Sequence, residues 1–207
     1  MKPTQTLPEN YRPIGTFDLS NNFRLLVWMN VLGLGVYILS GWLFIQILSW
    51  LRPNEAEPAL AAGIAGLQDI LGTLVGLVIL YAVVILLHEA LHGVFFWLYT
   101  HKRPVFAFKG AYAYAAAPEW FLPRNVYFVT AVAPLVGISL MGLAMFAVVP
   151  PSWFLPVLAA LIINAGGAAG DLWVAGWLLR QPPACYANDR GDAITLYLAG
   201  EAESRDQ

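Results

Sequence analysis

The stretch LVGLVILYAVVILLHEALHGVFFWLY, residues 74–99, decides the fold of this chain. It is longer than the roughly 20 apolar residues that an α-helix needs to cross a bilayer. We expect a membrane-spanning helix from about Asp69 to Tyr99. His88, Glu89 and His92 interrupt the apolar run near its C-terminal end. Ionisable side chains are costly inside a bilayer, so these three indicate a functional site.

The composition of the whole chain agrees with a membrane location. Of the 207 residues, 59% are hydrophobic and 12% are charged, whereas soluble domains carry about 25% charged residues. A soluble fold of this length could not bury so much apolar side chain. No dense basic run suggests a nucleic-acid partner. The single cysteine, Cys185, can form no internal disulfide and excludes a cysteine-rich zinc motif.

Three further segments are apolar and long enough to cross a bilayer. They run from about Phe23 to Leu51, from about Val126 to Val149 and from about Trp153 to Leu179. The predicted fold class is therefore an all-α membrane protein with about four transmembrane helices. The first 22 residues are polar and contain proline, so no cleavable signal peptide is expected. The expected division of the chain is an N-terminal segment, a four-helix domain and a C-terminal tail: 1–22, 23–181 and 182–207.

The positive charges predict the orientation. With four spans, both termini and the 100–125 loop share one side of the membrane. That side holds ten of the chain's 11 Lys and Arg residues, and the other side holds only Arg52. Loops on the cytoplasmic side are enriched in Lys and Arg. We therefore expect a multi-pass protein of the cell membrane with both termini and this loop in the cytoplasm.

The 100–125 loop contains two stretches of alternating residues around a glycine. Val105–Lys109 (VFAFK) and Ala111–Ala115 (AYAYA) flank Gly110. This pattern predicts a short β-hairpin between the second and third spans. An interfacial loop anchored by its aromatic side chains is the alternative.

The spacing of the HEALH segment is that of a zinc site. Residues four apart lie on one face of a helix, so His88 and His92 can point at one metal ion. Neutral imidazoles suit Zn²⁺. Glu89 lies beside the first ligand and can take a proton from an attacking water as general base. The alternative is two structural histidines and a buried glutamate, which hydrocarbon makes costly.

A catalytic zinc ion needs a third protein ligand. His101 is a weak candidate because it lies near the membrane surface, and Cys185 lies in the tail. Asp171 is the only acidic residue of the fourth span. At 1.5 Å per residue it lies roughly 13 Å from the cytoplasmic end of its span, and the two motif histidines lie roughly 10–16 Å from the end of theirs. These matching depths favour Asp171.

Other residues near Asp171 are open to two interpretations. Asn164 lies seven residues before Asp171, so both would share a face of one helix. Its amide could bind substrate or an oxyanion, or it could hydrogen-bond between helices. The glycines at 166, 167 and 170 favour close helix packing. Pro134 predicts a kink in the third span. The default expectation for Asp189, Arg190 and Asp192 is a solvated turn, and the alternative is a loop that folds back toward the site.

HEALHG on a membrane helix, followed by Asn164 and the Gly170-Asp171 pair, resembles the putative zincin peptidase family of bacterial membrane proteins. The resemblance runs from the second span to the tail. The layout is also similar to site-2 intramembrane metalloproteases, which implies that His88, His92 and Asp171 bind zinc and that Glu89 activates water. The chain departs from the site-2 pattern at two points. It has no proline between the asparagine and the aspartate, and Gly170 stands where those proteases usually have leucine.

The expected function is that of a membrane-embedded zinc metallopeptidase acting near the cytoplasmic face. Its expected partners are the lipid bilayer and a membrane-protein or peptide substrate. A β-hairpin beside the site could hold such a substrate in extended form. Two alternatives stay open: a non-proteolytic metal-binding membrane protein, and a metal-dependent hydrolase of a membrane-soluble small molecule.

Overall fold

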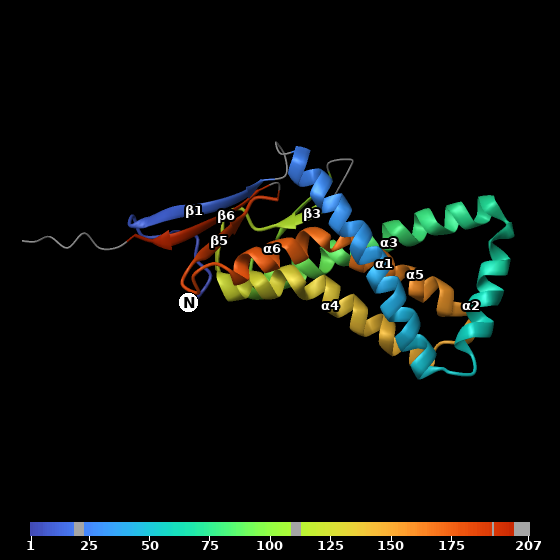
Figure 1. The fold of residues 1–207 in the computed structure, drawn as a ribbon. Coiled ribbons are helices and arrows are strands. Elements are labelled where there is room, and N and C mark those ends of the chain that lie inside the picture. Colours follow the sequence, from blue (N-terminus) through green and yellow to red (C-terminus); the bar gives the residue numbers. More distant parts are fainter. Residues whose placement is uncertain (19–22, 109–112, 192, 201–207) are drawn as a thin grey trace, which may run out of the picture. The chain divides into compact units, whose positions relative to one another are not determined.

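The computed structural model describes residues 1–18, 23–108, 113–191 and 193–200. Within them, three helices are long and apolar enough to cross a membrane: α1 (Phe23–Leu51), α3 (Ile70–Thr100) and α4 (Arg124–Val148) (Figure 1). Helices α5 (Phe154–Gly167) and α6 (Ala169–Leu179) form a fourth span if they are counted together. The predicted class, a mainly helical protein with about four candidate spans, is confirmed.

The chain divides into two compact units. The first contains residues 1–27, 89–133 and 171–207, and the second contains residues 28–88 and 134–170. Helices α3 and α4 each run through a boundary without interruption.

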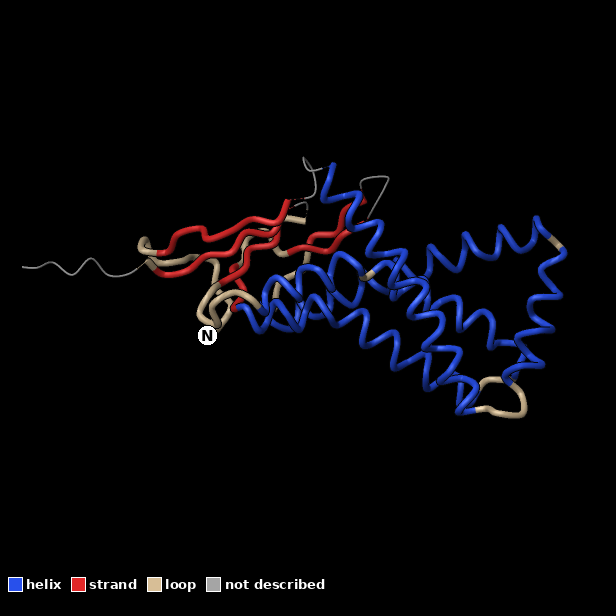
Figure 2. Tube along the Cα trace, viewed as in Figure 1, coloured by secondary structure: helices blue, strands red, loops and turns tan. Residues whose placement is uncertain are grey.

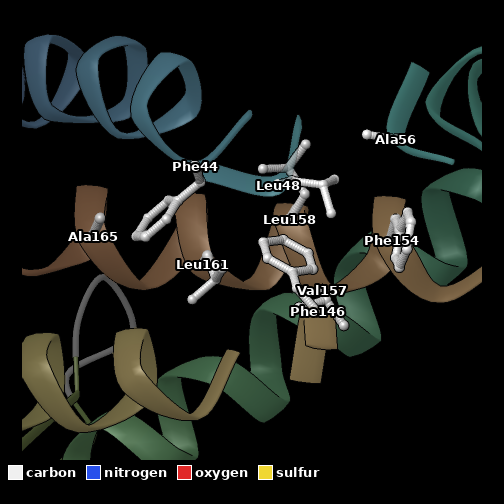
Figure 3. Packing of buried hydrophobic residues seen from close by; sticks show 9 residues of the cluster. All are labelled: Phe44, Leu48, Ala56, Phe146, Phe154, Val157, Leu158, Leu161 and Ala165. Atoms are coloured by element: carbon white, nitrogen blue, oxygen red, sulfur yellow. The ribbon is translucent and has the colours of Figure 1, made fainter. Parts of the chain in front are cut away.

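The second unit is helical and has its own apolar core. Phe44 and Leu48 of α1, Phe146 of α4, and Phe154 and Leu161 of α5 meet in this core (Figure 3). A short helix, α2 (Ala56–Ala65), and a 3₁₀ turn at Gly66–Gln68 connect α1 to α3. Glycine is needed at one close approach, because a Cβ at Gly142 would lie 2.5 Å from the Leu161 side chain.

Arg52 ties the end of α1 to the end of α4. Its guanidinium pairs with Glu55 and donates a hydrogen bond to the carbonyl of Phe146 at 3.1 Å. It also lies over the ring of Phe154, 5.1 Å from the centroid. Carbonyls at a helix C-terminus have no partner within the helix. Arg52 satisfies such a carbonyl at the end of α4.

The N-terminal half of α3 is apolar on all its faces. Only 6% of its most apolar 18-residue window is buried inside the protein. Exposed side chains include Ile70, Leu71, Val78 and Leu86. A helix that is hydrophobic all round needs an apolar surrounding, which a bilayer supplies. This half of the helix therefore fits contact with lipid.

The first unit contains a four-stranded antiparallel sheet. Its strands follow the order β1 (Tyr11–Asp18), β6 (Ala193–Ala199), β5 (Tyr186–Asp189) and β4 (Phe121–Pro123). Strands are drawn in red in Figure 2. These four strands were not predicted from the sequence. β1 contains Pro13 and Gly15, which weaken a strand signal, and its register shifts between them. Proline is tolerated there because β1 is an edge strand.

The predicted hairpin is confirmed. β2 (Val105–Phe108) and β3 (Ala113–Ala116) pair antiparallel, with Val105 opposite Ala116. The second strand ends at Ala116, one residue later than the sequence pattern predicted. The predicted turn at Gly110 lies outside the described residues.

The fourth span differs from the single helix that was expected. It breaks at Ala168, and α5 and α6 are bent by 46°. The glycines on either side of Ala168 are poor helix formers, which accounts for a break at this place. The break places Asp171 in the first turn of α6, where a carboxylate interacts favourably with the helix dipole. The spacing of seven residues therefore does not give Asn164 and Asp171 a shared helical face.

Replacing Leu161 with alanine tests the packing of the helical core. Its side chain is 1% exposed, so Leu161→Ala should lower the free energy of unfolding by about 2–5 kcal/mol. Leu140→Ala is the matched control, because Leu140 is 62% exposed and its loss should cost less than about 1 kcal/mol. Unfolding in mixed detergent micelles measures both. Equal losses in the two variants would contradict the described core.

Candidate metal centre

His88 and His92 lie one helical turn apart on α3, which is continuous from Ile70 to Thr100. Both side chains are buried. The helix itself places the two rings on one face, because residues four apart are neighbours along a helix. Their relative position is therefore a local property of α3.

The His92 ring is held by a backbone carbonyl of α4. Its Nδ1 lies 2.9 Å from the carbonyl oxygen of Thr130. A carbonyl oxygen can only accept, so the Nδ1–H group of His92 donates. In the neutral ring the lone pair is then on Nε2. That atom lies 3.4 Å from Oδ1 of Asp171.

The His88 ring is held by a side-chain amide. Its Nδ1 lies 2.9 Å from Oδ1 of Asn164, which is buried in the last turns of α5. The amide nitrogen of Asn164 donates to the carbonyl of Pro134 at 3.4 Å. Since that carbonyl can only accept, it orients the amide and turns the oxygen toward His88. His88 therefore also carries its proton on Nδ1 and its lone pair on Nε2.

Asp171 completes a group that could hold a metal ion. One ligand atom each from His88, His92 and Asp171 lies within 4.8 Å of the others. His101 and Cys185 are not members of this group. The structure thus brings together the three residues that the sequence analysis named and leaves out the two weaker candidates.

The donor set fits zinc. Two imidazole nitrogens and one carboxylate oxygen are a common ligand set for a catalytic zinc ion. Two ligands at about 2.0–2.1 Å from a tetrahedral ion lie about 3.3–3.4 Å apart, by the geometry of the tetrahedron. The Nε2–Oδ1 separation of His92 and Asp171, 3.4 Å, matches that spacing. Both imidazoles also have the outer oxygen partner on Nδ1 that zinc-binding histidines usually have.

Glu89 follows His88 on α3 and is half-buried. Its assignment as general base stays a prediction. Gly93, the next residue after His92, lies against the hairpin. A Cβ at Gly93 would lie 2.4 Å from the ring of Phe106 in β2, so glycine is required for this close approach. The glycine of HEALHG therefore lets β2 lie directly on the motif helix.

Asp189 belongs to the surroundings of the site, in line with the alternative expectation for this segment. The default expectation of a solvated turn is wrong for Asp189, because its side chain is buried in β5. Its Oδ2 accepts a hydrogen bond from the hydroxyl of Tyr127 at 2.7 Å, and its Oδ1 accepts one from the Gly191 N–H at 2.7 Å. The signal available in the sequence was Gly191, because glycine favours turns. In the structure Gly191 has a φ of +90°, a backbone conformation that glycine readily adopts. Asp192 lies outside the described residues.

Electrostatics connect Asp189 to the metal-ligand candidates. Burial raises the pKa of the Asp189 carboxyl, and the hydrogen bonds from Tyr127 and Gly191 oppose this shift. The charges of His92 and Asp171 also act on this pKa, in opposite directions. Asp189 is therefore close enough to the site for its charge to be felt there.

These features define a candidate zinc site in a protein with apolar helices long enough to cross a membrane. The chain belongs to the family described as putative zincin peptidase, whose sequence model matches residues 81–186, just over half of the chain. The match includes the whole HEALH segment, Asn164 and Asp171. The family description indicates a zinc-dependent metallopeptidase. No curated protein and no solved structure matches the chain.

Removing the hydroxyl of Tyr127 tests the buried pair. Tyr127→Phe leaves the buried Asp189 carboxylate without one of its donors, so the free energy of unfolding should fall by about 1–3 kcal/mol. Tyr186→Phe is the control, because the Tyr186 hydroxyl donates to the Lys2 carbonyl at an exposed position. Its loss should cost less than about 0.5 kcal/mol. A Tyr127→Phe protein as stable as the control would show that the pair contributes nothing.

Proposed function

We propose that this protein is a membrane-embedded zinc metallopeptidase that hydrolyses peptide bonds near the cytoplasmic membrane face. The observation that carries the proposal is the His88–His92–Asp171 group beside Glu89, with both imidazoles oriented through Nδ1. Membership of the zincin peptidase family supports the same reaction class.

The residues have separate roles in the proposed reaction. His88 and His92 would hold zinc through Nε2, and Asp171 through its carboxylate. When bound, zinc polarises the scissile carbonyl and lowers the pKa of the attacking water. Glu89 takes a proton from that water while the water oxygen forms a bond to the carbonyl carbon. The C–N bond then breaks, and Glu89 returns the proton to the leaving nitrogen.

Asn164 has a positioning role in this proposal. From the sequence, its amide could bind substrate or an oxyanion, or hydrogen-bond between helices. The amide oxygen instead accepts a hydrogen bond from Nδ1 of His88, and the amide nitrogen donates one to the carbonyl of Pro134. Both ends of the amide are therefore engaged, which favours orientation of the His88 ring over contact with substrate.

The hairpin favours a peptide as substrate over a membrane-soluble small molecule. Within the described residues its sheet has two strands, so β2 has an edge that no third strand covers. The side chains of Val105, Phe106 and Phe108 in β2 are exposed. An edge strand can bind an extended peptide through backbone hydrogen bonds. The contact of Phe106 with Gly93 keeps this strand beside the motif helix.

The orientation in the membrane remains part of the proposal. The site lies toward the C-terminal end of α3, next to the loop that carries Lys102 and Arg103. The excess of Lys and Arg on this side favours the cytoplasm. Peptide bonds near the cytoplasmic face would then be the ones within reach.

Zinc content and activity of four variants test the site. Wild-type protein should contain about one zinc ion per chain. His88→Ala and Asp171→Ala should lose most of it, whereas Glu89→Ala should keep the metal and lose activity by about 10²–10⁴-fold. His101→Ala is the control and should behave as wild type, because His101 is outside the ligand group. Elemental analysis gives the metal content, and mass spectrometry of a peptide mixture gives the cleavage.

Three results would each contradict a part of this proposal. Full zinc occupancy in Asp171→Ala would remove Asp171 from the ligand set. Equal cleavage by Glu89→Ala and wild type would exclude the proposed reaction. A zinc-containing wild type that cleaves no peptide would favour a non-proteolytic metal protein.

Cysteine labelling tests the orientation. After Cys185→Ala, single cysteines are introduced by Lys102→Cys and by Asn54→Cys, both at exposed positions. A maleimide that cannot cross membranes should label only the Asn54→Cys protein in intact cells, because position 102 is expected in the cytoplasm. Labelling of both after permeabilisation is the control. Labelling at position 102 in intact cells would reverse the orientation.

A further inference from the structure

Thr130 and Pro134 stand four residues apart within α4. In an α-helix the carbonyl of residue i accepts from the N–H of residue i+4. For Thr130 that residue is Pro134, which has no N–H. The Thr130 carbonyl is therefore without its ordinary helical donor. Thr130 is buried, where an unsatisfied carbonyl would be costly.

The donor that replaces the missing N–H is the candidate zinc ligand itself. His92 Nδ1 lies 2.9 Å from the Thr130 carbonyl oxygen. A regular helix offers such a carbonyl to a side chain only in competition with its own backbone. Proline removes this competition at the one turn that faces His92.

Pro134 is also connected to the other histidine. Its own carbonyl accepts from the amide nitrogen of Asn164 at 3.4 Å, and the oxygen of the same amide lies on His88. The outer partners of both imidazoles therefore depend on the same turn of α4. A proline that served only to bend the helix would not need either contact.

We propose that Pro134 is a positioning residue of the metal centre. Because proline has no N–H, the Thr130 carbonyl can accept a hydrogen bond from Nδ1 of His92. This bond holds His92 in the tautomer whose Nε2 can bind metal. This inference rests on the zinc site of the proposed function. The proline then has a second role besides bending α4, which is to keep the Thr130 carbonyl available to His92.

If Pro134 positions His92, replacing it should change zinc affinity and protein stability in different directions. Pro134→Ala supplies the missing N–H, which then competes with His92 for the Thr130 carbonyl. Alanine also favours the helix far more than proline does. Stability should therefore rise or stay level while zinc affinity falls, by about tenfold or more as for other outer-partner losses. If the role of Pro134 were purely structural, zinc affinity and stability would change together.

Pro134→Gly makes the test independent of helix propensity. Glycine restores the same N–H but is a much poorer helix former than alanine. The two variants should lose zinc affinity by the same factor despite different stabilities. Pro156→Ala is the matched control, since Pro156 lies in the first turn of α5, where the helix needs no N–H donor. Competition with a chelator measures the dissociation constant, and thermal unfolding of the zinc-free proteins measures stability.

The tautomer can be observed directly. The chain has three histidines, so ¹⁵N-histidine labelling gives few signals to assign. Zinc-free wild type should show His92 protonated on Nδ1, and Pro134→Ala should show a lower fraction of that form. Unchanged zinc affinity in both Pro134 variants would overturn the proposal. So would a zinc affinity that falls only in the less stable of the two variants. Zinc binding by a wild type that cleaves no peptide would refute the proposed peptidase and leave this inference standing, whereas a wild type that binds no zinc would overturn both.

Discussion

An apolar interior offers no hydrogen-bond partner to a polar side chain other than those that the protein supplies. The two buried histidines of the candidate site lie in a helix that is otherwise apolar, and this constraint accounts for the arrangement around them. Each Nδ1 has an oxygen acceptor, one from the Asn164 side chain and one from the Thr130 backbone. Across the described part of the chain, no buried side-chain nitrogen or oxygen lacks a hydrogen-bond partner. An imidazole satisfied in this way presents Nε2 for a metal ion.

The strands outside the spans contribute to the same site. β5 carries Asp189, and Asp189 holds the hydroxyl of Tyr127. Tyr127 lies one turn before Thr130 on α4, so this pair fixes the helix turn that accepts from His92. β5 itself is held between β4 and β6, and β6 pairs with β1 at the other end of the chain. β1 and β6, which are far apart in the sequence, are thereby part of the support of His92 in the C-terminal half of α3.

The predictions from sequence succeeded where one segment carries the whole signal. The long apolar runs predicted α1, α3 and α4 closely, because a span needs only length and composition. The alternation around Gly110 predicted the β2–β3 pair for a similar reason. The four-stranded sheet was missed, since β1 gains its conformation from pairing with β6 across most of the chain length. The break at Ala168 was also missed, although the glycines beside it were noted as a packing feature.

For the site, the sequence alone determined which residues share a helical face. His88, Glu89 and His92 are positioned by the repeat of α3, which is local and follows from the spacing of the residues. The tertiary structure decided everything that depends on other segments. It brought Asp171 to 3.4 Å from His92, assigned Asn164 to His88, and placed Asp189 in the interior. The spacing of four residues specifies two ligands because a helix is rigid over one turn. A third ligand and the tautomer of each ring depend on contacts between residues 38 to 79 positions apart, which no local pattern contains.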